Sequence, residues 1–546
     1  MQLPKHPPEL VQRFLHSVAV HPDKIAFIFI RDSGKADQLT YQSLYLKSSS
    51  LARRLSQQSG NSGGALLIYS AGFDFIIALF ACMLANIPAI PIAMPKPRTK
   101  DLFRHFLNHT KPDFILTTTS IEGRIKKLLP EAVSTYCLMT TDSAESDTKG
   151  FVPAHTSIEI ALIQYTSGTT TQPKGVKISF ENLYHNLSAI QQHFELDDKS
   201  ICFSWLPHYH DMGLVDGIMT PFFNGCLGIL CSPHYVISNP TQWLKVINRY
   251  RVTHTGGPNF FFELCTERIQ SASLKGTDLS SLTHVYVSAE PVRKKTLEKF
   301  AAYFSTCGFD LNLFTPGYGL AEATLMVSCK AMDTSLHYFV NDGQEYVGLG
   351  KAIPGMEIKI IDPVLHQEVK LGDTGEICLR GLSLTPGYTD GEKSEQTMIS
   401  LPASYETQSY FRTGDKGFLV ADELYVVGRF NDTIHIHGLK YQPEDLEYII
   451  INSHPTLFTS PCAVFSILKN EEEKIVVLLE VKEMTDSDKS IEVENSIRDC
   501  IFQAFGLTVF DIILLPQGSI LKTTSGKIKR SETKFNYLQG KFSNEV

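Results

Sequence analysis

From Ala65 onward, short apolar runs alternate with longer segments of helical pattern. Residues 65–69 and 89–92 are typical of buried strands, and residues 73–85 between them are typical of a helix. The alternation returns further along the chain, for example in the strand-like run 284–288. Strands that are separated by helices usually lie parallel in a layered sheet. The pattern therefore predicts an α/β fold with two parallel βαβ-type layered subdomains.

The pattern of predicted secondary structure changes near Glu357. Short strand-like runs follow one another closely from there and are separated by Gly, Asp and Pro, which indicates an antiparallel sheet or a small β-barrel. A further set of strands and helices follows Arg429 and is long enough to form a domain of its own. At 546 residues the chain is also too long for one hydrophobic core. We therefore predict a large N-terminal domain over residues 1–429 and a small, mobile α+β C-terminal domain over residues 430–546.

The composition excludes several classes of protein. The hydrophobic fraction of 43% and the charged fraction of 20% are those of a globular protein, and the net charge of -8 argues against nucleic acid as a partner. The 11 cysteines are scattered without metal or redox spacing, which fits a reducing compartment. Residues 1–10 lack an apolar signal core, and the longest apolar stretch, 71–94, is interrupted by Pro88 and Pro91. We expect a soluble cytoplasmic protein without integral membrane association.

The most informative segment is 165–176, with the sequence Tyr-Thr-Ser-Gly-Thr-Thr-Thr-Gln-Pro-Lys-Gly-Val. A strand-like run over 161–164 leads into a loop of Ser, Thr and Gly that ends in Lys174. Such a loop exposes backbone N–H groups and hydroxyls to an anion, and the lysine adds charge for outer phosphates. It is not a Walker loop, because Lys174 lies between Pro173 and Gly175. The segment predicts a phosphate-binding loop, to which an ordinary Ser/Thr turn is the alternative.

A second motif covers residues 316–324, with the sequence Pro-Gly-Tyr-Gly-Leu-Ala-Glu-Ala-Thr. Tyr318 offers an aromatic face for adenine. Glu322 supplies a hard oxygen ligand that suits a Mg²⁺ ion bridging phosphates. A glycine-flanked tyrosine on its own is typical of a turn, so this motif gains its meaning from its neighbours in the chain.

Together these segments resemble the signatures of adenylate-forming enzymes, which include acyl-CoA synthetases, luciferases and the adenylation domains of peptide synthetases. Two positions depart from that pattern, because Thr171 stands where many members have glycine and Leu521 where proline is usual. These departures affect the mobility and stiffness of the loops more than the chemistry. Further matches follow in the family's order: 288–291 (adenine pocket), Thr413-Gly-Asp415 (ribose), Gly428-Arg429 (ribose and phosphate) and 522–530 (catalytic-lysine loop).

The resemblance implies ATP and Mg²⁺ as cofactors and gives each motif a role. Lys527 would stabilise the negative charge that builds up on the transferring group and on pyrophosphate, although a basic run alone is typical of a solvated tail. Glu322 and Thr170 would bind the metal. The two oxygens of Asp415 would hold the ribose hydroxyls. The expected nucleotide-binding residues are Thr166, Ser167, Gly168, Thr169, Thr170, Lys174, Ser288, Ala289, Glu290, Pro291, Gly317, Tyr318, Gly319, Leu320, Asp415 and Arg429.

Residues 205–214, Trp-Leu-Pro-His-Tyr-His-Asp-Met-Gly-Leu, indicate the branch of the superfamily. They resemble the motif of fatty acyl-AMP ligases, in which His210 corresponds to a histidine beside the substrate carboxylate and the α-phosphate. Lys527, His210 and Glu322 are therefore the candidate catalytic residues. His435-Ile-His437 lacks a third ligand, so we expect no metal site there. Other matches to this branch are 258–260 with 263–265, 289–292 and 441–447.

The candidate acyl-pocket residues are Met212, Gly213 and Phe260, because small and aromatic side chains suit an apolar tunnel. Aromatic runs are also typical of a hydrophobic core, so a core position is the alternative interpretation of these residues. Fatty acyl-AMP ligases carry an insertion that restrains the C-terminal domain, and residues 329–346 are a short candidate for it. The resemblance places the hinge of that domain at Asn431.

The resemblance implies a ligase that converts a medium- to long-chain fatty acid and ATP to acyl-AMP and pyrophosphate. A second half-reaction would pass the acyl group to the phosphopantetheine of an acyl carrier protein. We expect that carrier to act in trans, because the chain ends shortly after Arg530. The alternatives are an acyl-CoA ligase with the same first step and, more distantly, a non-catalytic nucleotide-binding scaffold. An amino-acid substrate is disfavoured by the lack of an obvious acidic anchor for its amino group.

Overall fold

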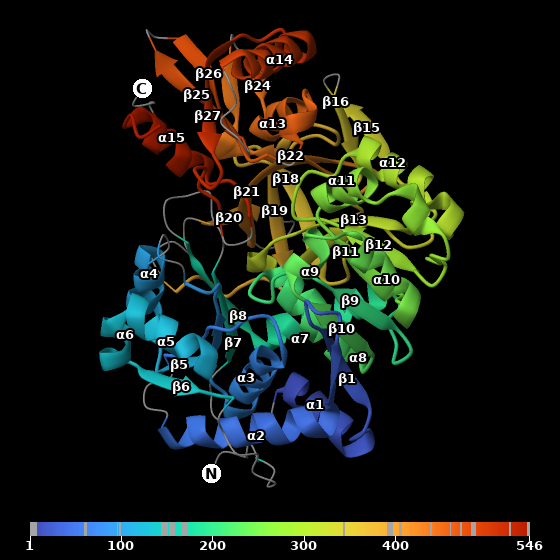
Figure 1. Ribbon diagram of the computed structural model, residues 1–546, viewed down its shortest axis with the longest axis vertical. Helices are drawn as coiled ribbons and strands as arrows, with labels where there is room; N and C mark the ends of the chain where they lie inside the picture. Colours follow the sequence, from blue (N-terminus) through green and yellow to red (C-terminus); the bar gives the residue numbers. More distant parts are fainter. Residues whose placement is uncertain are drawn as a thin grey trace.

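The computed structural model places the blue-to-yellow N-terminal part of the chain below a smaller orange-to-red C-terminal part (Figure 1). The described residues are 8–58, 63–95, 97, 100–142, 151, 159–165, 173–341, 344–389, 397–402, 407–436, 439–458, 460–469, 472–481, 487–523 and 526–542. None of the helices in these ranges combines the length and the apolar character that a bilayer crossing requires.

The first layered unit is a six-stranded sheet with the strand order β6-β5-β3-β4-β7-β8. Neighbouring strands are parallel except β7 and β8, which are antiparallel. Its strands are β3 (Ala65–Leu67), β4 (Ala89–Pro91), β5 (Phe114–Thr117), β6 (Cys137–Thr140), β7 (Ile160–Tyr165) and β8 (Gly175–Ser179). Its helices are α2 (Tyr41–Gln58), α3 (Phe73–Ala85), α4 (Lys100–Thr110), α5 (Thr119–Leu128) and α6 (Pro130–Thr135).

Side-chain alternation in this sheet separates two hydrophobic cores. Leu66 packs with α4, α5 and α6 on the outer face, whereas Ala65 and Leu67 face α2 and α3. Every residue of α3 from Phe75 to Leu84 is buried, because this helix lies in the core between layers. That position explains why the longest apolar stretch of the sequence is a core helix.

The second unit is a nine-stranded sheet with the order β17-β14-β13-β12-β11-β9-β10-β1-β2. The strands from β13 to β1 in that order are parallel, and the outer pairs are antiparallel. Its strands are β1 (Ile25–Ile30), β2 (Ala36–Thr40), β9 (Ile201–Ser204), β10 (Leu227–Cys231), β11 (His254–Gly257), β12 (His284–Val287), β13 (Phe314–Gly319), β14 (Met326–Cys329) and β17 (Lys351–Ala352). Its helices are α1 (Glu9–Val20), α7 (Phe180–His193), the π-helix η2 (Met212–Met219), α8 (Thr220–Asn224), α9 (Pro233–Ile237), α10 (Thr241–Tyr250), α11 (Asn259–Arg268) and α12 (Lys294–Phe304).

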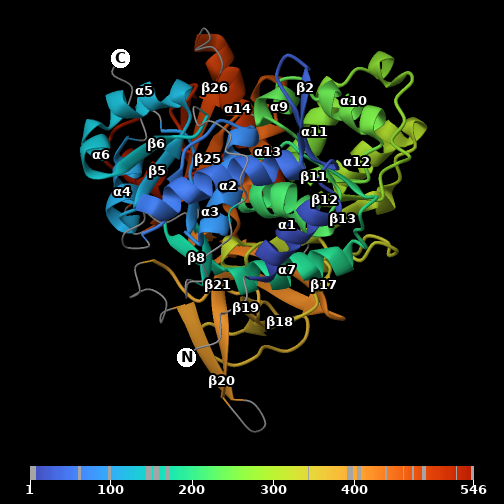
Figure 2. The same ribbon diagram turned by 90° about the horizontal axis from the view of Figure 1, so that it is seen from below.

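A five-stranded antiparallel sheet follows, which meets the expectation for the region after Glu357. Figure 2 shows it reaching past the two larger sheets, with β20 at its tip. Its strands are β18 (Met356–Ile361), β19 (Gly375–Gly381), β20 (Met398–Pro402), β21 (Thr407–Val420) and β22 (Glu423–Arg429). The insertion candidate 329–346 covers all but the last residue of a separate hairpin formed by β15 (Tyr338–Asn341) and β16 (Gln344–Val347).

The C-terminal domain has its own core, in which Leu446, Val464 and Ile497 are buried together. Its elements are η8 (Phe430–Asp432), β23 (Ile434–Ile436), β24 (Leu439–Tyr441), α13 (Pro443–Ile451), β25 (Cys462–Lys469), β26 (Glu472–Val481), α14 (Ser487–Phe505), β27 (Val509–Pro516) and α15 (Arg530–Leu538). The predicted fold class is confirmed: a mixed α/β fold with a large N-terminal and a small C-terminal domain. Where the boundary falls stays a prediction.

Candidate active site

A cavity of about 440 Å³ opens where the strands β12 and β13 end and the C-terminal domain approaches. The carboxyl ends of parallel strands are the usual place for a ligand in an open α/β sheet. The cavity brings together most of the residues that the motifs single out. These are Lys174, His210, Met212, Ser288, Ala289, Gly317, Tyr318, Gly319, Leu320, Glu322, Asp415, Arg429 and Lys527.

Four expected site residues lie outside the cavity lining. Phe260 is 38% exposed on α11, and its backbone N–H donates to Oε1 of Glu290 at 2.5 Å. A Cβ atom at Gly213 would lie 2.1 Å from the carbonyl oxygen of Pro207, so this glycine allows close packing of the π-helix. Glu290 and Pro291 also lie outside the lining. The expected phosphate-loop residues Thr166, Ser167, Gly168, Thr169 and Thr170 lie outside the described residues.

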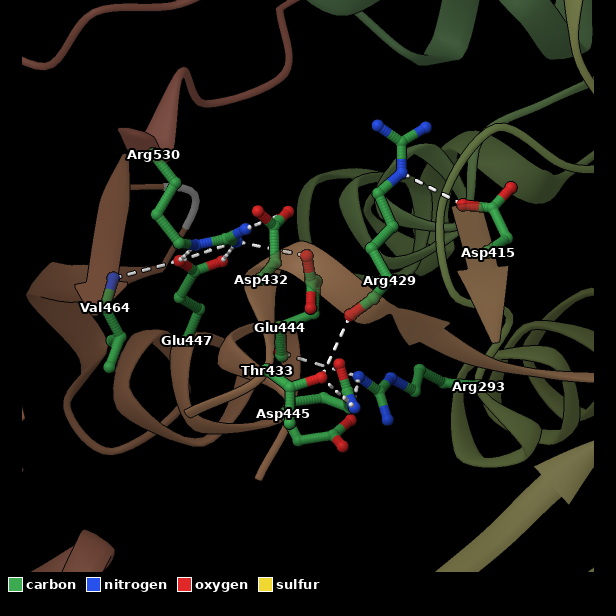
Figure 3. Close-up of polar contacts among 11 residues, drawn as sticks. Arg293, Asp415, Arg429, Asp432, Thr433, Glu444, Asp445, Glu447, Val464 and Arg530 are labelled. Atoms are coloured by element: carbon green, nitrogen blue, oxygen red, sulfur yellow. Dashed lines mark hydrogen bonds and ion pairs between the residues drawn. The ribbon is translucent and has the colours of Figure 1, made fainter. Parts of the chain in front are cut away.

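Asp415 is held from two sides at the cavity wall. The Tyr318 hydroxyl donates to its Oδ2 at 2.6 Å, and Nε of Arg429 donates to its Oδ1 at 3.0 Å, as Figure 3 shows for the arginine. Asp415 and Arg429 are register partners in the antiparallel pair β21–β22, which fixes this contact. Burial and the nearby carboxylate raise the pKa of Tyr318 well above its usual value. Each carboxylate oxygen has a second lone pair, so Asp415 can still accept hydrogen bonds from a diol.

Glu322 lies in the cavity together with two residues that bear on anion and metal binding. The Tyr388 hydroxyl donates to Oε1 of Glu322 at 2.9 Å, and Nζ of Lys174 lies 5.1 Å from the centre of the Tyr388 ring. Burial raises the pKa of Glu322, and the Tyr388 hydrogen bond works against that increase. The motifs did not single out Tyr388. Its only signal in the sequence is that it is an aromatic residue directly after a glycine, Gly387.

No group of three or more His, Cys, Asp or Glu side chains suited to a metal occurs in the described ranges. A Mg²⁺ ion usually takes one or two carboxylates and completes its shell with water and substrate phosphates. A single carboxylate, Glu322, in the wall of the 440 Å³ cavity fits that mode of binding. The site is therefore compatible with Mg²⁺ that arrives with a nucleotide.

His210, Asp211 and Lys527 also line the cavity and interact with one another. Nδ1 of His210 lies 2.5 Å from Oδ1 of Asp211. Burial raises the pKa of Asp211, but His210 and Lys527 more than offset it, so the net pKa lies below the usual value. Burial and the Arg429 charge lower the pKa of Lys527, while nearby carboxylates partly oppose them. The C-terminal domain thus brings the Lys527 cation into a site built by the N-terminal domain.

The loop that carries Lys527 is closed by two hydrogen bonds between Thr523 and Lys527. Thr523 N–H donates to the carbonyl of Lys527 at 2.7 Å, and Lys527 N–H donates to the Thr523 hydroxyl at 2.9 Å. The loop ends at Arg530, whose guanidinium pairs with Asp432 at 3.0 Å and with Glu447 at 3.0 Å (Figure 3). These bonds fix the loop to the start of the domain and to α13.

The chain was compared with known proteins. A family model described as AMP-binding enzyme matches residues 14–389, and a model described as Disco-interacting protein 2-like, AMP domain, matches residues 431–546. The medium-chain-fatty-acid–[acyl-carrier-protein] ligase JamA of Moorena producens is 34% identical, over 94% of this chain and 92% of that protein.

Two solved structures show the same architecture. A chain from a study of fatty acyl-adenylate ligases of E. coli and L. pneumophila is 28% identical, with a TM-score of 0.87 and complete coverage of both chains. A fatty acyl-adenylate ligase from L. pneumophila, in complex with acyl adenylate and pyrophosphate, is 32% identical, with a TM-score of 0.75 over 97% of this chain and 96% of that chain. Taken with the matched family model and the cavity, these likenesses show that the chain belongs to the AMP-binding enzymes and is an adenylate-forming ligase.

Proposed function

We propose that the protein activates a medium- to long-chain fatty acid as acyl-AMP and then transfers the acyl group to the phosphopantetheine thiol of an acyl carrier protein. The observation that carries the proposal is the position of Lys527 in the same cavity as Glu322, Asp415 and His210. The relatives above act, by their names, on fatty acids, and one of them acts on an acyl carrier protein.

In the first half-reaction a carboxylate oxygen attacks the α-phosphorus of ATP. A new P–O bond forms, the bond from the α-phosphorus to the bridging oxygen breaks, and pyrophosphate leaves with that electron pair. Lys527 and His210 contact the α-phosphate and stabilise the charge that develops there. Ser288, Ala289 and Tyr318 hold adenine, and Asp415 accepts hydrogen bonds from ribose. Glu322 would hold a Mg²⁺ ion that arrives with the nucleotide, and such an ion would supply positive charge for the leaving pyrophosphate.

In the second half-reaction the thiol of the carrier attacks the acyl carbonyl. The sulfur forms the thioester bond, the thiol gives up its proton, and AMP leaves. Lys527 must move out for the thiol to enter, so we propose that the C-terminal domain rotates about Asn431. The same chemistry with coenzyme A as acceptor is the alternative.

Contacts of Gln344, on the hairpin β15–β16, and of Arg293 favour a ligase that releases acyl-AMP over one that passes the acyl group at once to coenzyme A. Nε2 of Gln344 donates to Oδ2 of Asp445 on α13 at 2.5 Å, and Arg293 pairs with Oδ1 of the same carboxylate at 2.6 Å. The Arg293 guanidinium also lies 5.0 Å from the centre of the Tyr448 ring. Asp445 therefore ties the C-terminal domain to the N-terminal domain while Lys527 occupies the cavity. A domain restrained in this way favours release of acyl-AMP over capture by a small thiol.

Mass spectrometry of the purified enzyme with MgATP and dodecanoic acid, with and without coenzyme A, tests the proposed function. We expect acyl-AMP that persists when coenzyme A is added, and acyl transfer when a phosphopantetheinylated carrier protein replaces it. Efficient formation of acyl-CoA would assign the protein to the coenzyme A ligases. Absence of adenylate with fatty acids of every chain length would overturn the fatty-acid proposal.

The Asp445→Ala substitution should loosen the C-terminal domain. Loss of two partly buried interdomain contacts removes about 1 kcal/mol of docking energy, which corresponds to a roughly fivefold change in the docked population. We expect a matching decrease in the rate of acyl-AMP formation and an increase in acyl-CoA formation. Stopped assays of both products measure the two effects. The control is Glu267→Ala, which removes an ion pair with Lys299 inside the N-terminal domain. Equal product ratios in both variants would contradict the restraining role.

A further inference from the structure

The inner end of the cavity is polar, which is unusual for a wall that faces an alkyl chain. Asp216, Tyr286 and Thr315 line the cavity there, next to the apolar side chains of Phe194 and Met212. Tyr286 and Thr315 are register partners in the parallel pair β12–β13, so their side chains share one face of the sheet. Asp216 is the one charged residue within the apolar π-helix η2. Three elements therefore bring oxygen atoms to one end of the cavity.

This end lies deeper than the proposed nucleotide site. Tyr286 comes two residues before Ser288 on its strand, and Thr315 comes two residues before Gly317. At about 3.3 Å per strand residue, the polar end lies about 7 Å beyond the residues proposed to hold adenine. Met212, two residues after His210, lies about one helical turn before Asp216. The polar end therefore faces the acyl chain of the substrate, some distance from its carboxylate.

The Thr315 hydroxyl marks this end as a binding surface. The residue is 1% exposed, and its Oγ1 has no hydrogen-bond partner among the described residues. Buried hydroxyls in proteins are nearly always hydrogen-bonded, because an unpaired one loses its hydration without compensation. The Tyr286 hydroxyl lies beside Asp216, whose carboxylate adds to burial in raising the pKa of that tyrosine. A hydroxyl group on the substrate would donate to one of these oxygens and accept from another.

A buried chain of hydrogen bonds behind the wall determines the charge at this end. The Thr283 hydroxyl donates to the carbonyl of Thr253 at 3.0 Å, so it accepts from Nδ1 of His284 at 2.9 Å. Nε2 of His284 then lacks a proton, because burial lowers the pKa of this histidine well below its usual value. It follows that Nδ1–H of His254 donates to Nε2 of His284.

The other end of that chain is Asp216. Nε2 of His254 lies 2.8 Å from Oδ1 of Asp216, and both residues are buried. Since Nδ1 of His254 already carries a proton, one further proton is shared between Nε2 and the carboxylate. Whether it resides on the histidine or on the aspartate, the pair has no net charge. A neutral pair disfavours a substrate ammonium group and suits a neutral hydroxyl.

We propose that the protein prefers a fatty acid with a hydroxyl group on its chain, which Asp216, Tyr286 and Thr315 recognise at the inner end of the cavity. This inference rests on the proposed fatty-acid activation and specifies its substrate class. An unsubstituted chain would bury these oxygens without partners and would bind less well. Sites that are built to hydrogen-bond a substrate hydroxyl reject the analogue that lacks it for the same reason.

Pyrophosphate release with dodecanoic acid and with a positional series of monohydroxylated dodecanoic acids tests the proposal. We expect one isomer to exceed dodecanoic acid about tenfold in kcat/KM, as one or two net hydrogen bonds allow. The isosteric variants Thr315→Val and Tyr286→Phe should bring the ratio of the two substrates close to one. The Thr277→Val variant, on the surface of the same domain, should leave the ratio as in the wild type.

Two results would overturn the inference alone: dodecanoic acid is the best substrate of the series, or the ratio stays the same in Thr315→Val and Tyr286→Phe. In both cases adenylate still forms, so the proposed function stands. No pyrophosphate release with any acid of the series would overturn the fatty-acid function together with the inference. Because the measured quantity is a ratio of two substrates for one enzyme, a partial loss of folded protein does not affect it.

Discussion

The Lys527→Ala substitution should lower the rate of adenylate formation by roughly 10²–10³-fold, which is the usual cost of removing one group aimed at developing charge. Lys527 lies in the cavity with its pKa lowered by burial, and no other residue of the C-terminal domain lines the cavity within the described part of the chain. The effect should appear in kcat more than in KM, because the charge is needed chiefly in the transition state. Pyrophosphate exchange with ATP and dodecanoic acid measures it.

Two further variants separate the charge of Lys527 from its place in the loop. Lys529 pairs with Glu532 at 2.9 Å, so Lys529→Ala should cost little activity. Because the pKa of Lys527 is lowered, its active cationic form is lost as the pH rises toward a value below the usual 10.5. The rate of the wild-type enzyme should therefore fall as the pH rises toward the lowered pKa of Lys527. In Lys527→Arg the remaining activity should not fall over the same alkaline pH range, since arginine keeps its proton. A Lys527→Ala enzyme with near wild-type kcat would rule out the proposed role.

The Arg530→Met substitution should destabilise the C-terminal domain by about 3–5 kcal/mol, which is the usual effect of breaking a buried ion-pair cluster. Arg530 pairs with Asp432, Glu444 and Glu447, and its side chain is 8% exposed. Without the guanidinium the largely buried carboxylates of Asp432 and Glu447 lose their compensating charge. Burial already raises the pKa of Glu447, which shows how poorly its surroundings solvate a charge.

Hydrogen exchange followed by mass spectrometry measures this loss within one domain. The Val464 amide donates to Oε1 of Glu447 at 2.9 Å, so its protection reports directly on the cluster. Adding Glu447→Gln to Arg530→Met should recover part of the protection, because it removes one unpaired charge. Peptides from α3 in the N-terminal domain serve as the reference. Unchanged exchange at Val464 in Arg530→Met would contradict the stabilising role.

The sequence predicted the framework where local pattern and tertiary packing agree. Helix α3 has the predicted bounds because its apolar residues suit both a helix and the core. Strand β12 was predicted as 284–288 and observed as His284–Val287, since apolar residues in a parallel sheet are buried on both faces. The motifs around Glu322, Asp415 and Lys527 lie far apart in the sequence, yet the fold brings them to one cavity.

Other features depend on contacts that a sequence pattern does not contain. The π-helix η2 exists because Gly213 and Gly217 allow close approach to Pro207 and Ser204, so the orientation of Asp216 could not be inferred beforehand. The aromatic run 260–262 contains Phe260, which the sequence predicts to be a pocket residue. The helix instead divides the run, because Phe261 and Phe262 are buried in the core whereas Phe260 is exposed. Tyr388 reaches Glu322 across 66 positions of chain, a separation at which no local pattern operates.

The ion pairs of Arg530 also bear on timing. They join Asp432, which follows the proposed hinge residue Asn431, to the loop that carries Lys527. On the proposed mechanism, rotation about the hinge and withdrawal of Lys527 from the cavity are then a single movement. The C-terminal domain can place Lys527 for adenylation or leave the cavity open to a thiol, but it cannot do both at once. Each turnover must include one full swing in each direction, and the frequency of that swing sets the upper limit to the rate at which thioester is made.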